Sequence, residues 1–272
     1  MTERIFPARL EWPVAAENLD DVPRNTTRIR LISKATRFET LAEFKDLNAL
    51  WCFGIDQKKL DHISRCQSLQ RLYIGYNLRA GDFSPLKRLP KLDVLHLDSC
   101  SKVSGLEQLA ELTQLTGLSI ENFKNVHDIA PLLALTNLRE LAIDGSMWTR
   151  MTITSVEPIR NLSNLEFLSL TNTKVADESL EPLQELSNLK TLSIANFLPV
   201  AEFAKLSAKL PHCSCDWFKP YITTNLQCKK CGRNTRVMLS GKGTSMLCSQ
   251  CDVGRLAKHV NEFEQIKKGA GG

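Results

Sequence analysis

One short pattern, Leu-x-x-Leu-x-Leu, recurs along most of this 272-residue chain and restricts its fold more than any other feature. Successive copies begin 23, 23, 23, 27 and 24 residues apart, so the period is nearly constant. A fixed period of this size is typical of a protein built from stacked repeats. The copies are Leu69/Leu72/Ile74, Leu92/Leu95/Leu97, Leu115/Leu118/Ile120, Leu138/Leu141/Ile143, Leu165/Leu168/Leu170 and Leu189/Leu192/Ile194.

The pattern also predicts how the repeats pack. Each inward side chain is expected to contact its equivalent in the next repeat, so that the strands stack as a parallel sheet around one continuous core. Between the strands, apolar residues recur at helical spacing, and Pro131, Pro158 and Pro182 stand where a first helical turn tolerates proline. We therefore predict an α/β leucine-rich-repeat solenoid, with a parallel β-sheet on the concave face and short helices or 3₁₀ turns on the convex face.

The two ends of the predicted solenoid depart from the pattern. Residues 1–25 lack the repeat spacing and are expected to form an N-terminal cap, because an uncapped end would expose apolar surface. The solenoid is expected over 26–220 and begins with two degenerate repeats, Thr26/Ile29/Leu31 and Leu47/Leu50/Cys52. Near its other end, Cys213 and Cys215 occupy core positions of a last repeat, although a disulfide-bonded cap is an alternative for these two cysteines.

The amino-acid sequences of two repeats resemble those of a known protein family. Asp128-Ile129-Ala130-Pro131-Leu132 is followed by Leu135-Thr136-Asn137-Leu138-x-x-Leu141-x-Ile143, and Lys174-Val175-Ala176-Asp177 by Leu186-Ser187-Asn188-Leu189. These segments resemble the bacterial internalin-like class of leucine-rich repeats, over about residues 26 to 217. The resemblance implies a protein-binding scaffold without identifying its partner.

The overall composition is that of an ordinary globular protein, with 43% hydrophobic and 24% charged residues. The first thirty residues lack the apolar run of a secretory signal, and no stretch approaches the roughly 18 apolar residues of a membrane span. We therefore expect a cytoplasmic protein that does not bind a membrane.

The outward positions of the strands should line the concave face, and they change in character along it. Aromatic and basic side chains gather at the N-terminal end, and both dominate the energetics of protein interfaces. The predicted partner-binding residues there are Arg28, Arg30, Trp51, Phe53, Arg71, Tyr73 and Tyr76, followed by His96 and Asp98. The alternative is that the N-terminal cap folds over Trp51 and Phe53 and buries them.

One repeat is longer than its neighbours, and its extra residues fall within Ser146–Thr154. Trp148 lies in this insertion, between Met147 and Arg150, and these residue types are favoured at interfaces. We predict a second contact site at Trp148, with packing of Trp148 on the next repeat as the alternative.

The last part of the chain contains two Cys-x-x-Cys pairs. Cys228 and Cys231 are separated by sixteen residues from Cys248 and Cys251, a spacing that matches a four-cysteine zinc site. The intervening sequence predicts a β-hairpin, formed by 236–239 and 245–247, so residues 221–272 resemble a zinc ribbon. It is followed by a predicted helix, 255–268, and a flexible tail. Four protein ligands predict structural Zn²⁺, whereas the alternative is that the cysteines bind no metal or form disulfides.

Two other functions are alternatives to a protein-binding scaffold. Catalysis by His96, Asp98 and Cys100 is not expected, because strand alternation turns Cys100 into the core while His96 faces outward. Nucleic-acid binding through the ribbon is the alternative, because residues 221–272 contain nine Lys/Arg against three Asp/Glu. Four thiolates around Zn²⁺ would reduce this charge of +6 to about +4. We therefore predict a non-catalytic scaffold that binds a protein partner, with a nucleic-acid-associated adaptor as the alternative.

Overall fold

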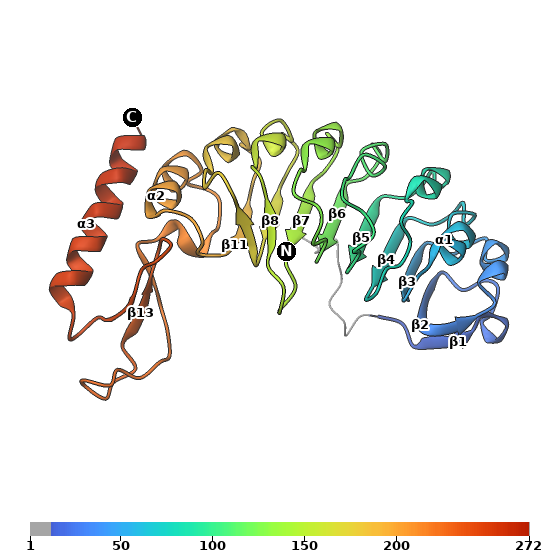
Figure 1. Cartoon of the computed structure of the whole chain (residues 1–272), viewed down its shortest axis with the longest axis horizontal. Helices are drawn as coiled ribbons and strands as arrows, with labels where there is room; N and C mark the ends of the chain where they lie inside the picture. Colours follow the sequence, from blue (N-terminus) through green and yellow to red (C-terminus); the bar gives the residue numbers. More distant parts are fainter. Residues whose placement is uncertain (1–11, 272) are drawn as a thin grey trace.

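A computed structural model describes residues 12–271 and shows an arc of parallel strands (Figure 1). Nine strands form the main sheet, and each of the nine pairs with the one that follows it along the chain. Two short strands in loops, β8 (Met151–Ile153) and β10 (Thr173–Val175), pair with each other outside this sheet. The nine are β1 (Ala15–Asn18), β2 (Arg28–Thr36), β3 (Ala49–Phe53), β4 (Arg71–Gly75), β5 (Val94–Asp98), β6 (Gly117–Glu121), β7 (Glu140–Asp144), β9 (Phe167–Leu170) and β11 (Thr191–Ile194). The predicted leucine-rich-repeat solenoid is confirmed.

The leucines of the repeat lie in register across the sheet. Leu95 pairs with Leu72 on one side and with Leu118 on the other, and Leu118 pairs in turn with Leu141. All four side chains are buried in a core that runs the length of the solenoid. Because side chains alternate along a strand, this register places the intervening residues on the concave face.

The convex side contains short helices, as the proline positions predicted. The helix α1 (Gln57–Ile63) is capped by Asp56, whose carboxylate accepts the N–H of Lys59 at 3.0 Å. The other repeats use 3₁₀ helices at Phe38–Glu43, Ser84–Arg88, Ala130–Ala134, Glu157–Ile159 and Glu181–Glu185, whereas residues 106–112 form only turns. Two more 3₁₀ helices, Leu19–Asp21 and Asp216–Phe218, lie near the ends of the solenoid.

Polar side chains join neighbouring repeats outside the core. The asparagine before the first leucine of a repeat donates its amide to a carbonyl of the preceding repeat, at 2.8 to 2.9 Å. These bonds are Asn137 to Thr113, Asn164 to Thr136 and Asn188 to Ser163. They satisfy loop carbonyls that the sheet leaves unpaired.

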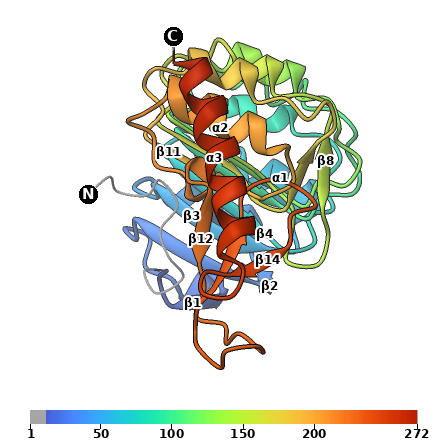
Figure 2. The same ribbon diagram turned by 90° about the vertical axis from the view of Figure 1, so that its left-hand side faces the viewer.

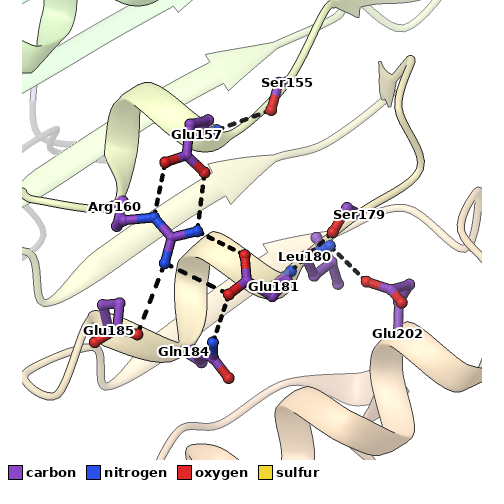
Figure 3. Close-up of polar contacts among 9 residues, drawn as sticks. All are labelled: Ser155, Glu157, Arg160, Ser179, Leu180, Glu181, Gln184, Glu185 and Glu202. Carbon is purple, nitrogen blue, oxygen red and sulfur yellow. Dashed lines mark hydrogen bonds and ion pairs between the residues drawn. The ribbon is translucent and has the colours of Figure 1, made fainter.

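An ion-pair network crosses the convex face between the 3₁₀ helices Glu157–Ile159 and Glu181–Glu185 (Figure 3). The guanidinium of Arg160 contacts Glu157 at 2.8 Å and Glu181 at 2.6 Å, and these carboxylates raise its pKa further. Beyond this network, Glu202 of helix α2 (Val200–Lys209) accepts the backbone N–H of Leu180 at 2.7 Å. Polar contacts therefore connect consecutive repeats to α2.

The longest repeat accommodates its extra residues in a loop. Strand β8 (Met151–Ile153) pairs with β10 (Thr173–Val175) outside the main sheet, while β7 still pairs directly with β9. Gly145 is required at the start of this loop, because an added Cβ would lie 2.3 Å from the carbonyl oxygen of Asn172. The insertion thus leaves the leucine register intact.

The N-terminal residues extend the sheet. Strand β1 pairs in parallel with β2, and Leu19 behind it is fully buried. The predicted cap, 1–25, lies in part outside the described residues, and within 12–25 the chain supplies one more strand to cover the core.

The C-terminal residues cover the other end. Three antiparallel strands, β12 (Tyr221–Thr223), β13 (Arg236–Leu239) and β14 (Met246–Cys248), lead into helix α3 (Val253–Ala270). The helix packs against α2 and crosses the end of the solenoid (Figures 1 and 2). Its Phe263 is fully buried within the core of the solenoid itself. Within residues 12–271, none of the helices combines the length and hydrophobicity that a membrane crossing requires.

Two details at this end differ from the sequence predictions. The hairpin of β13 and β14 is confirmed, but the third strand, β12, was not predicted. Helix α3 begins at Val253 and continues to Ala270, so the predicted flexible tail is helical at Gly269 and Ala270. The helix is longer because it packs on α2, a helix that the repeat pattern did not reveal.

Candidate partner-binding face and metal centre

An aromatic cluster lies at the N-terminal end of the concave face. It consists of Trp12, Phe53, Tyr73 and Tyr76, and the ring centroid of Trp12 lies 5.0 Å from Tyr73 and 5.9 Å from Phe53. Phe53 also stacks on Tyr76 at 5.9 Å. Gly75 makes room for this packing, since an added Cβ would lie within 2.8 Å of the Tyr73 and Phe53 rings.

Arginine side chains surround the aromatic cluster. The guanidinium of Arg30 lies 5.3 Å from the Trp12 ring centroid and 5.9 Å from that of Phe53, and Arg28 lies 5.3 Å from Trp51. Among the described residues, 12–271, the buried Nε of Arg30 has no hydrogen-bond acceptor. Arg71 lies nearby on β4 and is exposed.

A pocket of about 520 Å³ opens beside Arg30. Its walls are Trp12, Arg30, Ile32, Ser33, Phe53, Gly54, Tyr76 and Asn77. Aromatic walls with one charged group are typical of a site that binds an apolar group and orients it by a polar contact.

Trp12, from the expected N-terminal cap, covers part of Phe53 at this end of the face. Trp12 packs on Phe53, which stays half-buried, and Trp51 is only 3% exposed. Trp51 therefore offers little accessible surface to a partner, whereas Tyr76, at 53% exposure, remains accessible. The sequence did not reveal the role of Trp12, because this residue lies outside the repeat.

His96 and Asp98 are buried on the same face. The imidazole of His96 stacks on Tyr73 with centroids 4.1 Å apart, and its Nδ1 lies 2.9 Å from the hydroxyl of Ser119. Burial lowers the pKa of His96 to about 3, so this side chain is neutral at physiological pH. Asp98 accepts the N–H of Tyr76 at 3.2 Å and the hydroxyl of Ser99 at 2.6 Å.

Three carboxylates stand in line at the ends of β5, β6 and β7. Asp98 pairs in register with Glu121, and Glu121 pairs with Asp144. Asp144 accepts hydrogen bonds from Ser169 and Thr171, yet burial raises its pKa to about 6. We call Asp98, Glu121 and Asp144 the acidic row. The sequence placed these residues on the face but did not single out Glu121 and Asp144 as a site.

The second predicted contact site is a protruding loop. Trp148 is 89% exposed and Met147 is 84% exposed, so the alternative that Trp148 packs on the next repeat is wrong. Arg150 packs on Phe197, which follows β11 two repeats further on, with its guanidinium 4.1 Å from the ring centroid. The loop is thereby fixed at its base while Trp148 faces solvent.

The four cysteines of the two Cys-x-x-Cys pairs meet at one point. The sulfur atoms of Cys228, Cys231, Cys248 and Cys251 all lie within 4.8 Å of one another. Cys231 and Cys248 are 3.8 Å apart, far beyond the length of a disulfide bond. All four are free thiols, so the disulfide alternative for them is not supported.

This separation fits a tetrahedral metal site. With metal–sulfur bonds of about 2.3 Å, the sulfur atoms of a regular tetrahedron lie about 3.8 Å apart. Each pair is held by its own turn. In the first, the N–H of Gly232 donates to the backbone carbonyl of Cys228, and in the second the N–H of Cys251 donates to the sulfur of Cys248. A bound cation would leave no coordination position open for a substrate.

Hydrogen bonds lower the pKa of two of the four thiols, Cys231 through the backbone N–H of Arg233 and Cys248 through a hydroxyl. The hydroxyl of Thr235 lies 3.1 Å from the sulfur of Cys248 and lowers the pKa of that thiol to about 6. Asp252 accepts the N–H of Cys248 at 2.9 Å and fixes this turn. Such supporting contacts orient metal ligands in known sites.

The remaining cysteines and two basic residues have structural explanations. Cys52, Cys100, Cys213 and Cys215 lie in the core as predicted, and the last two are free thiols, so no disulfide cap is present there. In the ribbon, Lys230 pairs with Asp252 at 3.3 Å, and Lys242 pairs with Glu178 of the solenoid. These pairs reduce the basic surface that nucleic-acid binding would use, while Lys229 and Arg233 remain exposed.

Comparison with known proteins supports the fold. No protein-family model matches the chain, and no curated protein matches it. An internalin (InlF) from Listeria monocytogenes strain 4b F2365 matches with a TM-score of 0.52 at 21% identity, over 70% of this chain. The chain spans 60% of the length of that internalin.

Two further solved structures match with TM-scores below 0.5. Internalin C2 of the same strain gives a TM-score of 0.48 at 28% identity, over 61% of this chain and 68% of its own. The plant peptide hormone receptor RGFR1, solved in complex with RGF2, gives 0.47 at 13% identity, over 74% and 37%. The chain is thus a leucine-rich-repeat protein with the fold seen in an internalin, and it ends in a small antiparallel sheet with four clustered cysteines.

Proposed function

We propose that this protein is a non-catalytic scaffold that binds another protein on the concave face of its repeats. The observation that carries the proposal is the pocket beside Arg30, where a guanidinium and three aromatic rings face the concave side. Aromatic and arginine side chains contribute most of the binding energy at protein interfaces. Trp148 would supply a second contact from the loop after β7.

The four cysteines would hold a structural Zn²⁺ in this proposal. Four thiolates saturate a tetrahedral zinc ion, so the metal would stabilise the ribbon rather than activate a water molecule. We also propose a cytoplasmic location, because a site of reduced thiols needs a compartment that keeps cysteines reduced.

The test is capture of a partner from cell lysate by the zinc-loaded full chain. Phe53→Ala combined with Tyr76→Ala should reduce retention of a nuclease-resistant partner by about tenfold or more, as expected when interface anchors are lost. Leu133→Ala is the matched control, because Leu133 is 55% exposed on the convex side and should not matter. Equal retention by the double variant and the control would refute the concave site, and loss of the partner on nuclease treatment would favour the nucleic-acid adaptor.

A further inference from the structure

We infer that the pocket beside Arg30 binds an acidic side chain of the partner, an aspartate or a glutamate, together with an apolar side chain next to it in the partner's sequence. The guanidinium of Arg30 pairs with the carboxylate, and the aromatic walls cover the apolar neighbour. This inference rests on the proposed function and specifies the chemistry of the partner residues that enter the pocket.

The side chain of Arg30 has unused capacity to bind an anion. Within residues 12–271, it takes part in no ion pair, and its buried Nε has no acceptor. A polar group that is buried without a hydrogen-bond partner costs free energy, and a charged group costs more. A carboxylate would accept two parallel hydrogen bonds from the guanidinium, the geometry in which arginine and carboxylates pair most strongly.

The charges around the pocket favour an anion. Glu17, on the adjoining strand β1, is exposed and forms no ion pair in the described part of the chain. On β5, Asp98 bonds to Tyr76 and Ser99 rather than to an arginine. The charged residues of β2, β3 and β4 are all basic, namely Arg28, Arg30, Lys34 and Arg71. An acidic side chain would therefore enter a region whose strands carry only positive charge.

The lining of the pocket selects a single charge beside an apolar group. Among the described residues that line it, Arg30 alone is charged, so a singly charged carboxylate matches the site better than a doubly charged phosphate. Trp12 and Phe53 flank the guanidinium, with ring centroids at 5.3 and 5.9 Å, and Ile32 adds an aliphatic wall. The volume of about 520 Å³ lies within the range of pockets that bury small ligands, so an apolar neighbour fits beside the carboxylate.

The experiment uses an array of ten-residue peptides probed with the full-length, zinc-loaded chain. Each peptide has a Gly/Ser background and a two-residue core, in either order. One core position is Leu, Phe, Tyr or Gly, and the other is Glu, Asp, Gln, Asn or Lys. Cores that combine an acid with Leu, Phe or Tyr should bind about tenfold more strongly than their amide counterparts, because charge-assisted hydrogen bonds are roughly twice as strong as neutral ones.

Variants of the protein assign the carboxylate to its site. Arg30→Gln should abolish the preference for acid over amide, whereas Arg71→Gln, which changes a residue outside the pocket lining, should weaken binding less. Arg65→Gln is the matched control, because Arg65 is exposed and lies outside the strands. The comparison of acid and amide peptides uses the unaltered protein, so it does not depend on the folding of any variant.

The outcomes separate this inference from the scaffold proposal. Equal binding of acid and amide peptides, no binding to any peptide, or a larger loss in Arg71→Gln than in Arg30→Gln would overturn the acidic residue at Arg30. The scaffold would still stand if lysate capture remained sensitive to Phe53 and Tyr76. If the array showed no preference for acids and the capture did not respond to Phe53 and Tyr76, both proposals would fail.

Discussion

The burial of Phe263 allows a test of whether α3 holds the end of the solenoid closed. Phe263 is fully buried in the solenoid core, although it belongs to helix α3, which begins only at Val253, after the last repeat and the ribbon. Replacing a buried phenylalanine by alanine costs about 3 to 5 kcal/mol, because apolar contacts are lost and a cavity remains. Phe263→Ala should therefore favour the state in which α3 is detached.

Native-state hydrogen exchange measures this opening. Each 1.4 kcal/mol is a factor of ten, so amides of α3 should exchange roughly 100- to 3,000-fold faster in Phe263→Ala. Amides of β5 and β6, at the centre of the sheet, should change much less. Val253→Ala is the control on the same helix, since Val253 is 60% exposed. Unchanged exchange in α3, or equal acceleration in β5 and β6, would show that Phe263 does not hold a separable cap.

Three other predictions concern the metal centre, the loop and the acidic row. Reduced protein should contain about one zinc per chain by elemental analysis, and Cys248→Ser should lose it whereas Cys213→Ala should keep it. Trp148→Ala should change the free energy of urea unfolding by less than about 0.5 kcal/mol, because the side chain is 89% exposed. The folded pKa of Asp144, about 6, lies above its ordinary value of 3.8, so folding favours the protonated form and stability should fall as pH rises from about 4 to 6. Asp144→Asn should reduce the dependence of the unfolding free energy on pH over this range, and an unchanged dependence would exclude Asp144 as its source.

The repeat pattern predicted the parts of the structure that depend on periodic packing. Leu95 and Leu118 lie in register because each repeat buries the same positions, so the spacing alone places their strands side by side. The same register correctly assigned Cys52 and Cys100 to the core. The four clustered cysteines were predictable for a related reason, since two Cys-x-x-Cys turns approach one another when a hairpin joins them.

Contacts between distant, non-repeating segments could not be predicted in this way. Trp12 packs on Phe53 and Tyr73 from a segment without periodicity, and α3 packs on α2 although 43 residues separate the two helices. Such contacts depend on the shape of both partners rather than on a local pattern. The acidic row arises from three repeats with different sequences, which the register aligns only in three dimensions.

If a partner binds the concave face as proposed, the closed C-terminal end limits the length of the segment that the face can hold. Nine strands at a spacing of about 4.8 Å give a face about 38 Å long, and α3 prevents a second solenoid from continuing it. An extended segment of about eleven residues would cover the full length of that face. A longer segment would have to fold back on itself or extend past Trp148. The partner surface that contacts the face should therefore be short, and α3 should set its limit at the C-terminal end.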